Sequence, residues 1–123
     1  MAARCLKIAV VYFVIAVLMG ISMGILQFFA VSSVHAHLNL LGWVSLALVG
    51  LIYRAYPKAG ETRLASVHFW LHNIGLPLMQ GSLFIMMTTG NHGLVIGAII
   101  GSILIGVGVI LFAVNVCQQV RDS

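Results

Sequence analysis

The sequence predicts an all-α fold, a four-helix transmembrane bundle with both termini in the cytoplasm, and two observations predict it. Of the 123 residues, 62 % are hydrophobic and 7 % are charged, and the mean hydropathy is +1.15. A soluble domain carries about 25 % charged residues, so a chain of this composition could not cover its surface in water. No Lys, Arg, Asp or Glu lies between Lys7 and Arg54 or between Arg63 and Arg121, and each gap is long enough for two spans of about 20 residues. A soluble enzyme, a nucleic-acid-binding module and a disordered tail are thereby excluded.

The chain is predicted to form one domain, residues 1–123, with four spans at about 6–31, 34–56, 64–88 and 93–116. Ser32 and Ser33 break the first apolar run. The segment Pro57–Thr62 contains Pro, Lys, Gly and Glu and therefore indicates a loop, and Thr89–His92 forms the last turn. The apolar runs are continuous and too few for a barrel, which indicates helices. Short loops make neighbouring helices antiparallel.

The basic residues predict the orientation. All six Lys and Arg residues lie at the N-terminus, in the middle loop or at the C-terminus, and the positive-inside rule places such segments in the cytoplasm. We therefore expect a multi-pass protein of the cytoplasmic (inner) membrane, with the bilayer as its solvent. A signal peptide is the competing interpretation of residues 1–31, but the apolar stretch exceeds the roughly 7–15 residues of a signal-peptide core.

Histidine is the ionisable residue type that remains inside the predicted spans. Asp, Glu, Lys and Arg are absent from all four, which argues against a proton-driven transporter with buried carboxylates and against a channel with a charged filter. An uncharged imidazole can coordinate a metal without bringing a formal charge into the bilayer. The sequence therefore indicates heme iron or a soft metal, with five candidate ligands: His35, His37, His68, His72 and His92.

His35 and His37 lie at the outer end of the second span and point to nearly opposite sides of a helix. His35 shares its face with Asn39 and Gly42, so we expect that face to look into the bundle. His37 shares its face with leucines and is expected to lie at the lipid interface. His92 lies in the outer turn, at the same level as His35. It could be a solvated loop residue or a ligand.

The inner candidates lie on the third span. His68 and His72 are four residues apart and share one helical face. They could hold a metal between them, or one could ligate while the other donates a hydrogen bond. Met79 and Met86 are further candidate heme partners, with core packing as the plainer role.

Small residues line one face of the fourth span, where we expect close helix packing or, less directly, the approach of a flat macrocycle. They are Gly93, Gly97, Gly101 and Gly108, and Gly20 and Gly24 repeat the pattern more weakly on the first span.

The segment Val34-His35-Ala36-His37-Leu38-Asn39-Leu40-Leu41-Gly42-Trp43 resembles the second helix of subunit I of heme-copper oxidases, especially the cbb-type and nitric oxide reductase branch. The third span, with Phe69-Trp70 followed by His72-Asn73, resembles the third helix of that subunit. By this resemblance His35 takes the place of the low-spin heme ligand. The family's second heme ligand, its copper ligands and its high-spin heme ligand lie on later helices, so oxygen reduction by this chain alone is not expected. The arginine that the family has before the helix-two histidine is also missing.

Three functions follow as hypotheses. The first is a b-type cytochrome that binds heme b for electron transport or diatomic-gas binding, as a homo-oligomer with a redox partner or quinone. The second is a non-heme copper or iron protein, an accessory or chaperone. The third is a structural subunit. Because His72 lies roughly 24 Å below the outer end of its span, we expect His35 and His72 to belong to two separate layers rather than to share one iron.

Overall fold

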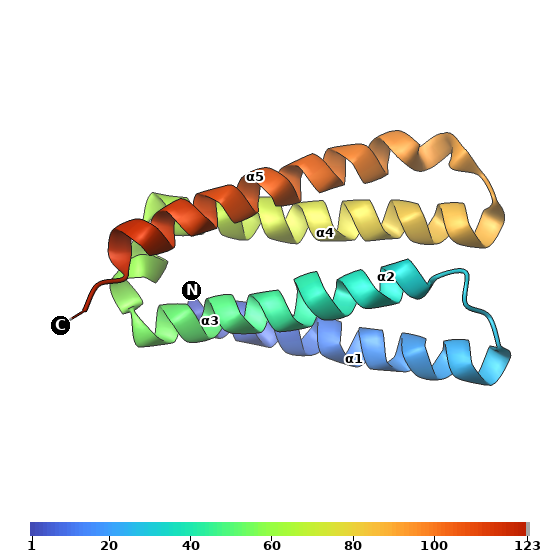
Figure 1. Cartoon of the computed structure of the whole chain (residues 1–123), viewed down its shortest axis with the longest axis horizontal. Helices are drawn as coiled ribbons and strands as arrows, with labels where there is room; N and C mark the ends of the chain where they lie inside the picture. The colour runs from blue at the N-terminus through green and yellow to red at the C-terminus, as the bar shows by residue number, and fades with distance from the viewer. Residues whose placement is uncertain (123) are drawn as a thin grey trace.

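The computed structural model describes residues 1–122, and every regular element in that range is helical (Figure 1). The long helices are α1 (Ala2–Leu26), α4 (Arg63–Thr89) and α5 (Val95–Gln119). A fourth rod is continuous and consists of α2 (Ser32–His37), the π-helix η1 (Leu38–Val44) and α3 (Ser45–Ala55). Two short 3-10 turns, η2 (Pro57–Glu61) and η3 (His92–Leu94), complete the order. The all-α prediction is confirmed.

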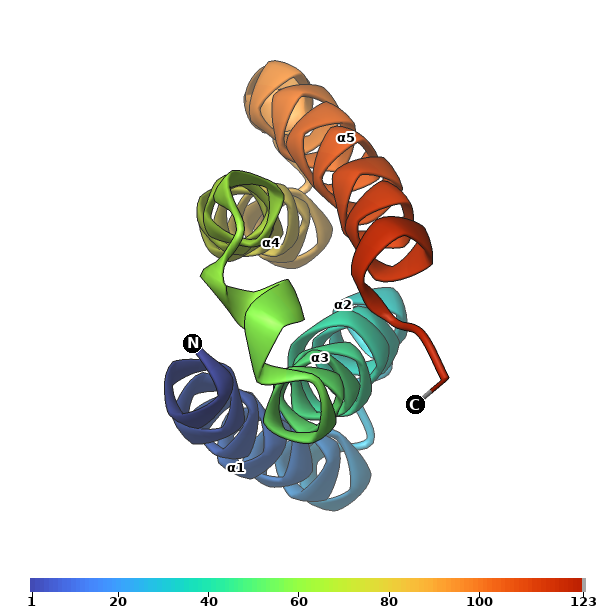
Figure 2. The ribbon, with the colours of Figure 1, turned by 90° about the vertical axis from the view of Figure 1, so that its left-hand side faces the viewer.

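The four rods form two antiparallel hairpins, one of α1 with α2–η1–α3 and one of α4 with α5 (Figures 1 and 2). Within each hairpin the helices pack along much of their length. Between the hairpins the backbones come close at few places, chiefly from α2 and η1 to α4. Side chains also meet across the gap, as Tyr53 of α3 and Phe112 of α5 do with ring centroids 6.0 Å apart. Both chain ends and η2 lie towards one end of the bundle, and the turns after α1 and α4 lie at the other (Figure 1).

The first helix begins and ends earlier than predicted. It covers Ala2–Leu26 rather than about 6–31. The helix ends at Leu26 because Gln27 adopts a left-handed conformation (φ 51°) and its backbone N–H donates to Met23 O. The Gln27 side chain also donates to Gly24 O at 2.7 Å. The break therefore lies at residues 27–31, and Ser32, which was expected in the turn, begins the next helix.

The other two turns lie where they were predicted. Thr62 caps α4 by accepting a hydrogen bond from Ala65 N at 3.1 Å. Gly90 ends α4 with a φ of 71°, which glycine adopts without a steric cost.

Within residues 1–122, three helical segments are long and apolar enough to cross a membrane: Ala2–Leu26, Ser32–Ala55 and His92–Gln119. The fourth predicted span, α4, has 27 residues and thus a length of about 40 Å, but it is more polar. The polar side chains His68, His72 and Gln80 are turned into the protein, with 1 %, 1 % and 2 % exposed, whereas the exposed polar residues Arg63, Ser66, Thr88 and Thr89 lie towards its two ends. The protein itself therefore covers the groups that lower the hydropathy of α4.

Glycines bring α4 and α5 together, as the small-residue pattern predicted. A Cβ added to Gly101 would lie 2.5 Å from Met79 N and 2.7 Å from Gly75 O, and one added to Gly97 would lie 2.5 Å from Ser82 Oγ. Gly93 differs, because its nearest neighbour is Asn91 in its own turn. The first hairpin uses Gly42 in the same way, against the ring of Tyr12.

Candidate functional site

His35 faces α1, the neighbouring helix of its own hairpin. Its Nδ1 lies 2.9 Å from Ala16 O, and its ring packs on Gly20, where an added Cβ would come within 2.8 Å of Cε1. A carbonyl oxygen can only accept, so Nδ1 carries the proton and Nε2 of the neutral ring keeps a lone pair. Nε2 lies 3.5 Å from Asn39 Nδ2, at the limit of a hydrogen bond, and that amide also donates to His35 O at 3.1 Å.

Metal-binding histidines commonly share this arrangement. Ligating histidines usually donate their second ring N–H to a backbone carbonyl or carboxylate, which fixes the tautomer and the ring orientation. The predicted grouping of His35, Asn39 and Gly42 on one face is confirmed, but that face packs on α1 and not between the hairpins.

The π-helical segment η1 directs a carbonyl towards α4. Ser45 N donates to Leu40 O, five residues back, instead of to Leu41 O, four residues back, and Ser45 Oγ donates to the same oxygen at 2.6 Å. Leu41 O accepts a hydrogen bond from His72 Nε2 at 2.8 Å. Since π-turns widen a helix and release a carbonyl, this irregularity supplies the hydrogen bond that joins the two hairpins at mid-length.

His68 and His72 form a buried pair on α4. His68 Nε2 lies 3.1 Å from His72 Nδ1, and the two rings meet edge to face with centroids 5.1 Å apart. Because His72 Nε2 must donate to Leu41 O, its Nδ1 must accept, and His68 Nε2 must therefore be the donor. The remaining nitrogen, His68 Nδ1, is an acceptor that is buried without a partner.

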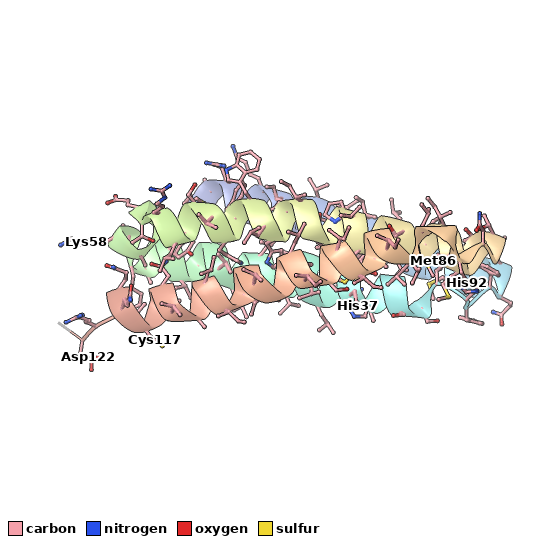
Figure 3. The ribbon with its side chains drawn as sticks, turned by 90° about the horizontal axis from the view of Figure 1, so that it is seen from above. His37, Lys58, Met86, His92, Cys117 and Asp122 are labelled. Carbon is pink, nitrogen blue, oxygen red and sulfur yellow. The ribbon has the colours of Figure 1, made fainter. Side chains whose placement is uncertain are left out.

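The other predicted site residues lie apart from these two histidine centres. His37 bonds within its own helix, with Nδ1 2.7 Å from Ser33 O. His92 is exposed in η3, and Met86 is buried on α4. Figure 3 shows Met86 and His92 towards the end of the bundle that is far from Lys58 and Asp122. Met79 is buried, and its Sδ accepts a hydrogen bond from Ser102 Oγ at 3.0 Å.

The two histidine centres occupy different depths. His35 bonds to α1, while His72 bonds to Leu41, which is six residues and so roughly 9 Å further along the same rod. In the described part of the chain no three His, Cys, Asp or Glu side chains stand together as a metal-binding group.

Three buried polar residues, Asn115, Gln80 and Ser82, were not singled out from the sequence. Asn115 is 0 % exposed, accepts a hydrogen bond from Thr62 Oγ1 at 2.7 Å and donates to Ala59 O at 2.9 Å. Gln80 is buried, and both atoms of its amide lack a partner. The signal was available, since each is an uncharged polar residue within a predicted span.

Comparison with known proteins gives one curated relative. The chain is 35 % identical over 57 residues to the Cbb3-type cytochrome c oxidase subunit CcoN1 of Stutzerimonas stutzeri. The match covers 42 % of this chain and 12 % of that subunit, so the chain corresponds to a small part of its relative. No family model matches the chain, and no solved structure matches it significantly. The resemblance to subunit I of the cbb-type oxidases, which the histidine-containing helix predicted, is confirmed as a similarity of sequence.

Proposed function

We propose that this chain is a b-type membrane cytochrome that binds heme b through Nε2 of His35. The observation that carries the proposal is the hydrogen bond from His35 Nδ1 to Ala16 O. It leaves the lone pair on Nε2, as ligation of iron requires, and Asn39 Nδ2, 3.5 Å from that nitrogen, would have to give way to the iron. This histidine stands in the segment that resembles the heme-ligating helix of the oxidases.

The residues present fit one axial position of a heme. His35 is half-buried at the surface of its hairpin, and Gly20 provides the space that its ring occupies. Bound heme b would supply an iron that exchanges electrons or binds a diatomic gas. Around it, Ala16 orients the ring and Asn39 lies beside the ligating nitrogen.

A second ligand to the iron is proposed to come from another copy of the chain, because the His35 face packs on α1 while Met86 and His92 belong to the other hairpin. His72 is less suited, because both of its ring nitrogens are already bonded within the protein. Two hairpins offer little enclosure for a macrocycle beside His35, so a homo-oligomer that covers the heme is part of the proposal.

The proposed topology has four spans with both termini in the cytoplasm. α4 supplies the fourth span, since its buried polar groups face the protein and its length matches the bilayer. The basic residues at both termini and in the middle loop set the orientation.

The test is the absorption spectrum of the purified protein. We expect a Soret band, with sharp α and β bands on reduction. The variant His35→Ala should lose this heme signal, whereas His37→Ala, the same change two residues away, should keep it. A colourless preparation that contains copper would instead favour the non-heme metal protein, and one without metal would favour a structural subunit.

A pair of glycine variants tests the positioning of His35 more finely. An added Cβ at Gly20 would meet His35 Cε1, while one at Gly24 would meet nothing within 4 Å. We expect Gly20→Ala to weaken heme retention about tenfold, as changes around a ligand commonly do, and to shift the α band. Gly24→Ala should leave both unchanged. Equal behaviour of the two variants would argue against His35 as the ligand.

A further inference from the structure

An apolar groove lies between α1 and α4, on the side of the bundle where the start of α1 faces α4 (Figure 2). It consists of two hollows of about 490 and 430 Å³, which adjoin at Pro77 because that residue lines both. The first hollow is lined on α1 by residues between Lys7 and Ile15. The second continues along the same two helices, and its lining includes Met19 of α1 and Phe84 of α4.

The groove has the length of one lipid leaflet. The rise of α1 from Lys7 to Met19 is about 18 Å, and one leaflet contributes about 15 Å to a hydrocarbon core of about 30 Å. From Lys7 to Leu26, where α1 ends, the rise is about 29 Å, which places Lys7 at the boundary of the core. A lipid chain that enters beside Lys7 can therefore follow the groove to the middle of the bilayer.

Two cations of α1 stand where the groove begins. The side chain of Lys7 is exposed and lines the first hollow. Arg4 lies three residues earlier, on the same face of the helix, and its guanidinium carbon is 4.2 Å from the centre of the Phe69 ring of α4. Neither α1 nor α4 contains an Asp or a Glu. This end of the groove therefore matches a negative charge, while the rest of it matches hydrocarbon.

The lining distinguishes between the possible occupants. No histidine lines either hollow, so the groove offers no imidazole to a heme iron. A second copy of the chain in the same orientation would bring its own basic residues to the level of Arg4 and Lys7, and like charges at an interface repel. A free phosphate would leave the apolar length of the groove uncovered. A molecule with an anionic head and a long apolar chain fits both parts.

We propose that the groove binds one anionic phospholipid, taken from the leaflet at the end of the bundle that carries both chain ends. Its phosphate lies at Arg4 and Lys7, and one acyl chain lies between α1 and α4. Basic pockets between membrane helices are suited to anionic head groups. The site shares no residue with His35 and its hydrogen-bond partners, so it does not depend on the heme proposed there.

The experiment is native mass spectrometry of the full-length protein in an uncharged detergent, with phosphatidylglycerol or phosphatidylcholine of identical acyl chains added. We expect each chain to retain one phosphatidylglycerol, about tenfold more strongly than phosphatidylcholine, because two cations face the head group. Equal retention of the two lipids would overturn the proposal. A homo-oligomer that excludes lipid would overturn it as well, since a second copy would then fill the groove.

A change of charge at Lys7 tests the head-group end. Lys7→Gln should weaken the retention of phosphatidylglycerol about fivefold, and Lys7→Arg, which keeps the charge, should retain the lipid as the unaltered protein does. The matched control Lys58→Gln removes the same charge from η2, outside the groove, and should weaken retention by less than about twofold. Equal losses in the two glutamine variants would mean that diffuse charge attracts the lipid, and would refute the site.

A change of volume at Gly81 tests the apolar end. Gly81 lines the second hollow, and a Cβ added there would meet no atom within 4 Å, so a leucine side chain has room to occupy the hollow. Gly81→Leu should weaken the retention of phosphatidylglycerol about tenfold. The control Gly106→Leu makes the same change at an equally open position of α5 outside the groove, and should bind normally. Unchanged retention in Gly81→Leu would contradict the path of the acyl chain.

The same spectra also count heme, which keeps the two proposals separate. We expect the heme content of the Lys7 and Gly81 variants to equal that of the unaltered protein. Loss of lipid together with loss of heme in these variants would mean that the groove holds the heme, and would overturn the lipid site.

Discussion

Asn115 shows how one buried amide joins three separate parts of the chain. Its Oδ1 accepts from Thr62 Oγ1 and its Nδ2 donates to Ala59 O. The hydroxyl of Tyr53 lies 3.4 Å from the same amide nitrogen. Thr62 in turn caps α4. A single side chain on α5 therefore secures the loop between the hairpins, the end of α3 and the start of α4.

Asn115→Ala should destabilise the protein by about 2 kcal/mol, because Ala59 O loses a donor and Thr62 Oγ1 loses its shorter hydrogen bond and keeps only Ala59 O, 3.2 Å away. The measurement is the unfolding free energy in detergent or bicelles, for example by steric trapping. The control is Gln118→Ala, an exposed amide close by on the same helix, which should change stability by less than about 0.5 kcal/mol. Equal effects of the two changes would mean that the hydrogen bonds of Asn115 contribute nothing to stability.

At the scale of elements, the α4–α5 interface depends on backbone-to-backbone approach. The Gly101 position admits no side chain, because an added Cβ would meet backbone atoms of Met79 and Gly75 and not the flexible end of a side chain. Gly106, on the same helix, has open space around it within 4 Å. The two positions therefore form a natural pair for testing the role of close approach.

Gly101→Ala should destabilise the hairpin by about 1–3 kcal/mol through overpacking. Gly106→Ala should be neutral or slightly stabilising, since alanine favours a helix by roughly 0.5–1 kcal/mol over glycine. Thermal unfolding followed by circular dichroism in the same detergent compares the two. Loss of stability in both variants would point to a general need for glycine rather than to this contact.

The elements also show what the sequence can and cannot disclose. The spacing of His68 and His72 predicted their common face, and the turn residues at Pro57–Thr62 and Gly90 predicted two of the three breaks correctly. The end of α1 was misplaced because Gln27, a residue without the usual preference for a left-handed conformation, terminates it.

The tertiary partners could not be read from local patterns. The π-helix at Leu38–Val44 releases a carbonyl to His72, which is 31 residues away from Leu41 in the chain. Asn115 and Thr62 are 53 residues apart. The His35 face was expected to point into the bundle, and the structure shows its ring packed on Gly20 of α1. Each outcome depends on which helices become neighbours.

For the whole molecule, the arrangement of the ends is the property that experiment can check most directly. Both chain ends and η2 lie towards one end of the bundle, and the turn between α4 and α5 lies at the other (Figure 1). All six basic residues belong to segments at the first end. The fold and the charge pattern therefore agree on which segments share a side of the membrane.

Reporters that are active in the cytoplasm should be active when fused after Ser123 or within Pro57–Thr62, and inactive at Gly90. The same fusions with a periplasmic reporter should give the reverse pattern. Activity of the cytoplasmic reporter at Gly90 would contradict the orientation, and with it the depth assigned to every histidine.

The buried polarity of α4 also bears on how the protein is made. α4 leaves the ribosome before α5, so at that moment His68 lacks the contacts that it makes with Gly108 and Phe112 of α5. We expect α4 to remain outside the lipid until α5 emerges, and the two to enter the bilayer together as a hairpin. A chain that stops at Leu94 and continues into a soluble linker long enough to clear the ribosome should then leave a cysteine introduced into α4 accessible to a label, and one that stops at Gln119 before the same linker should protect it.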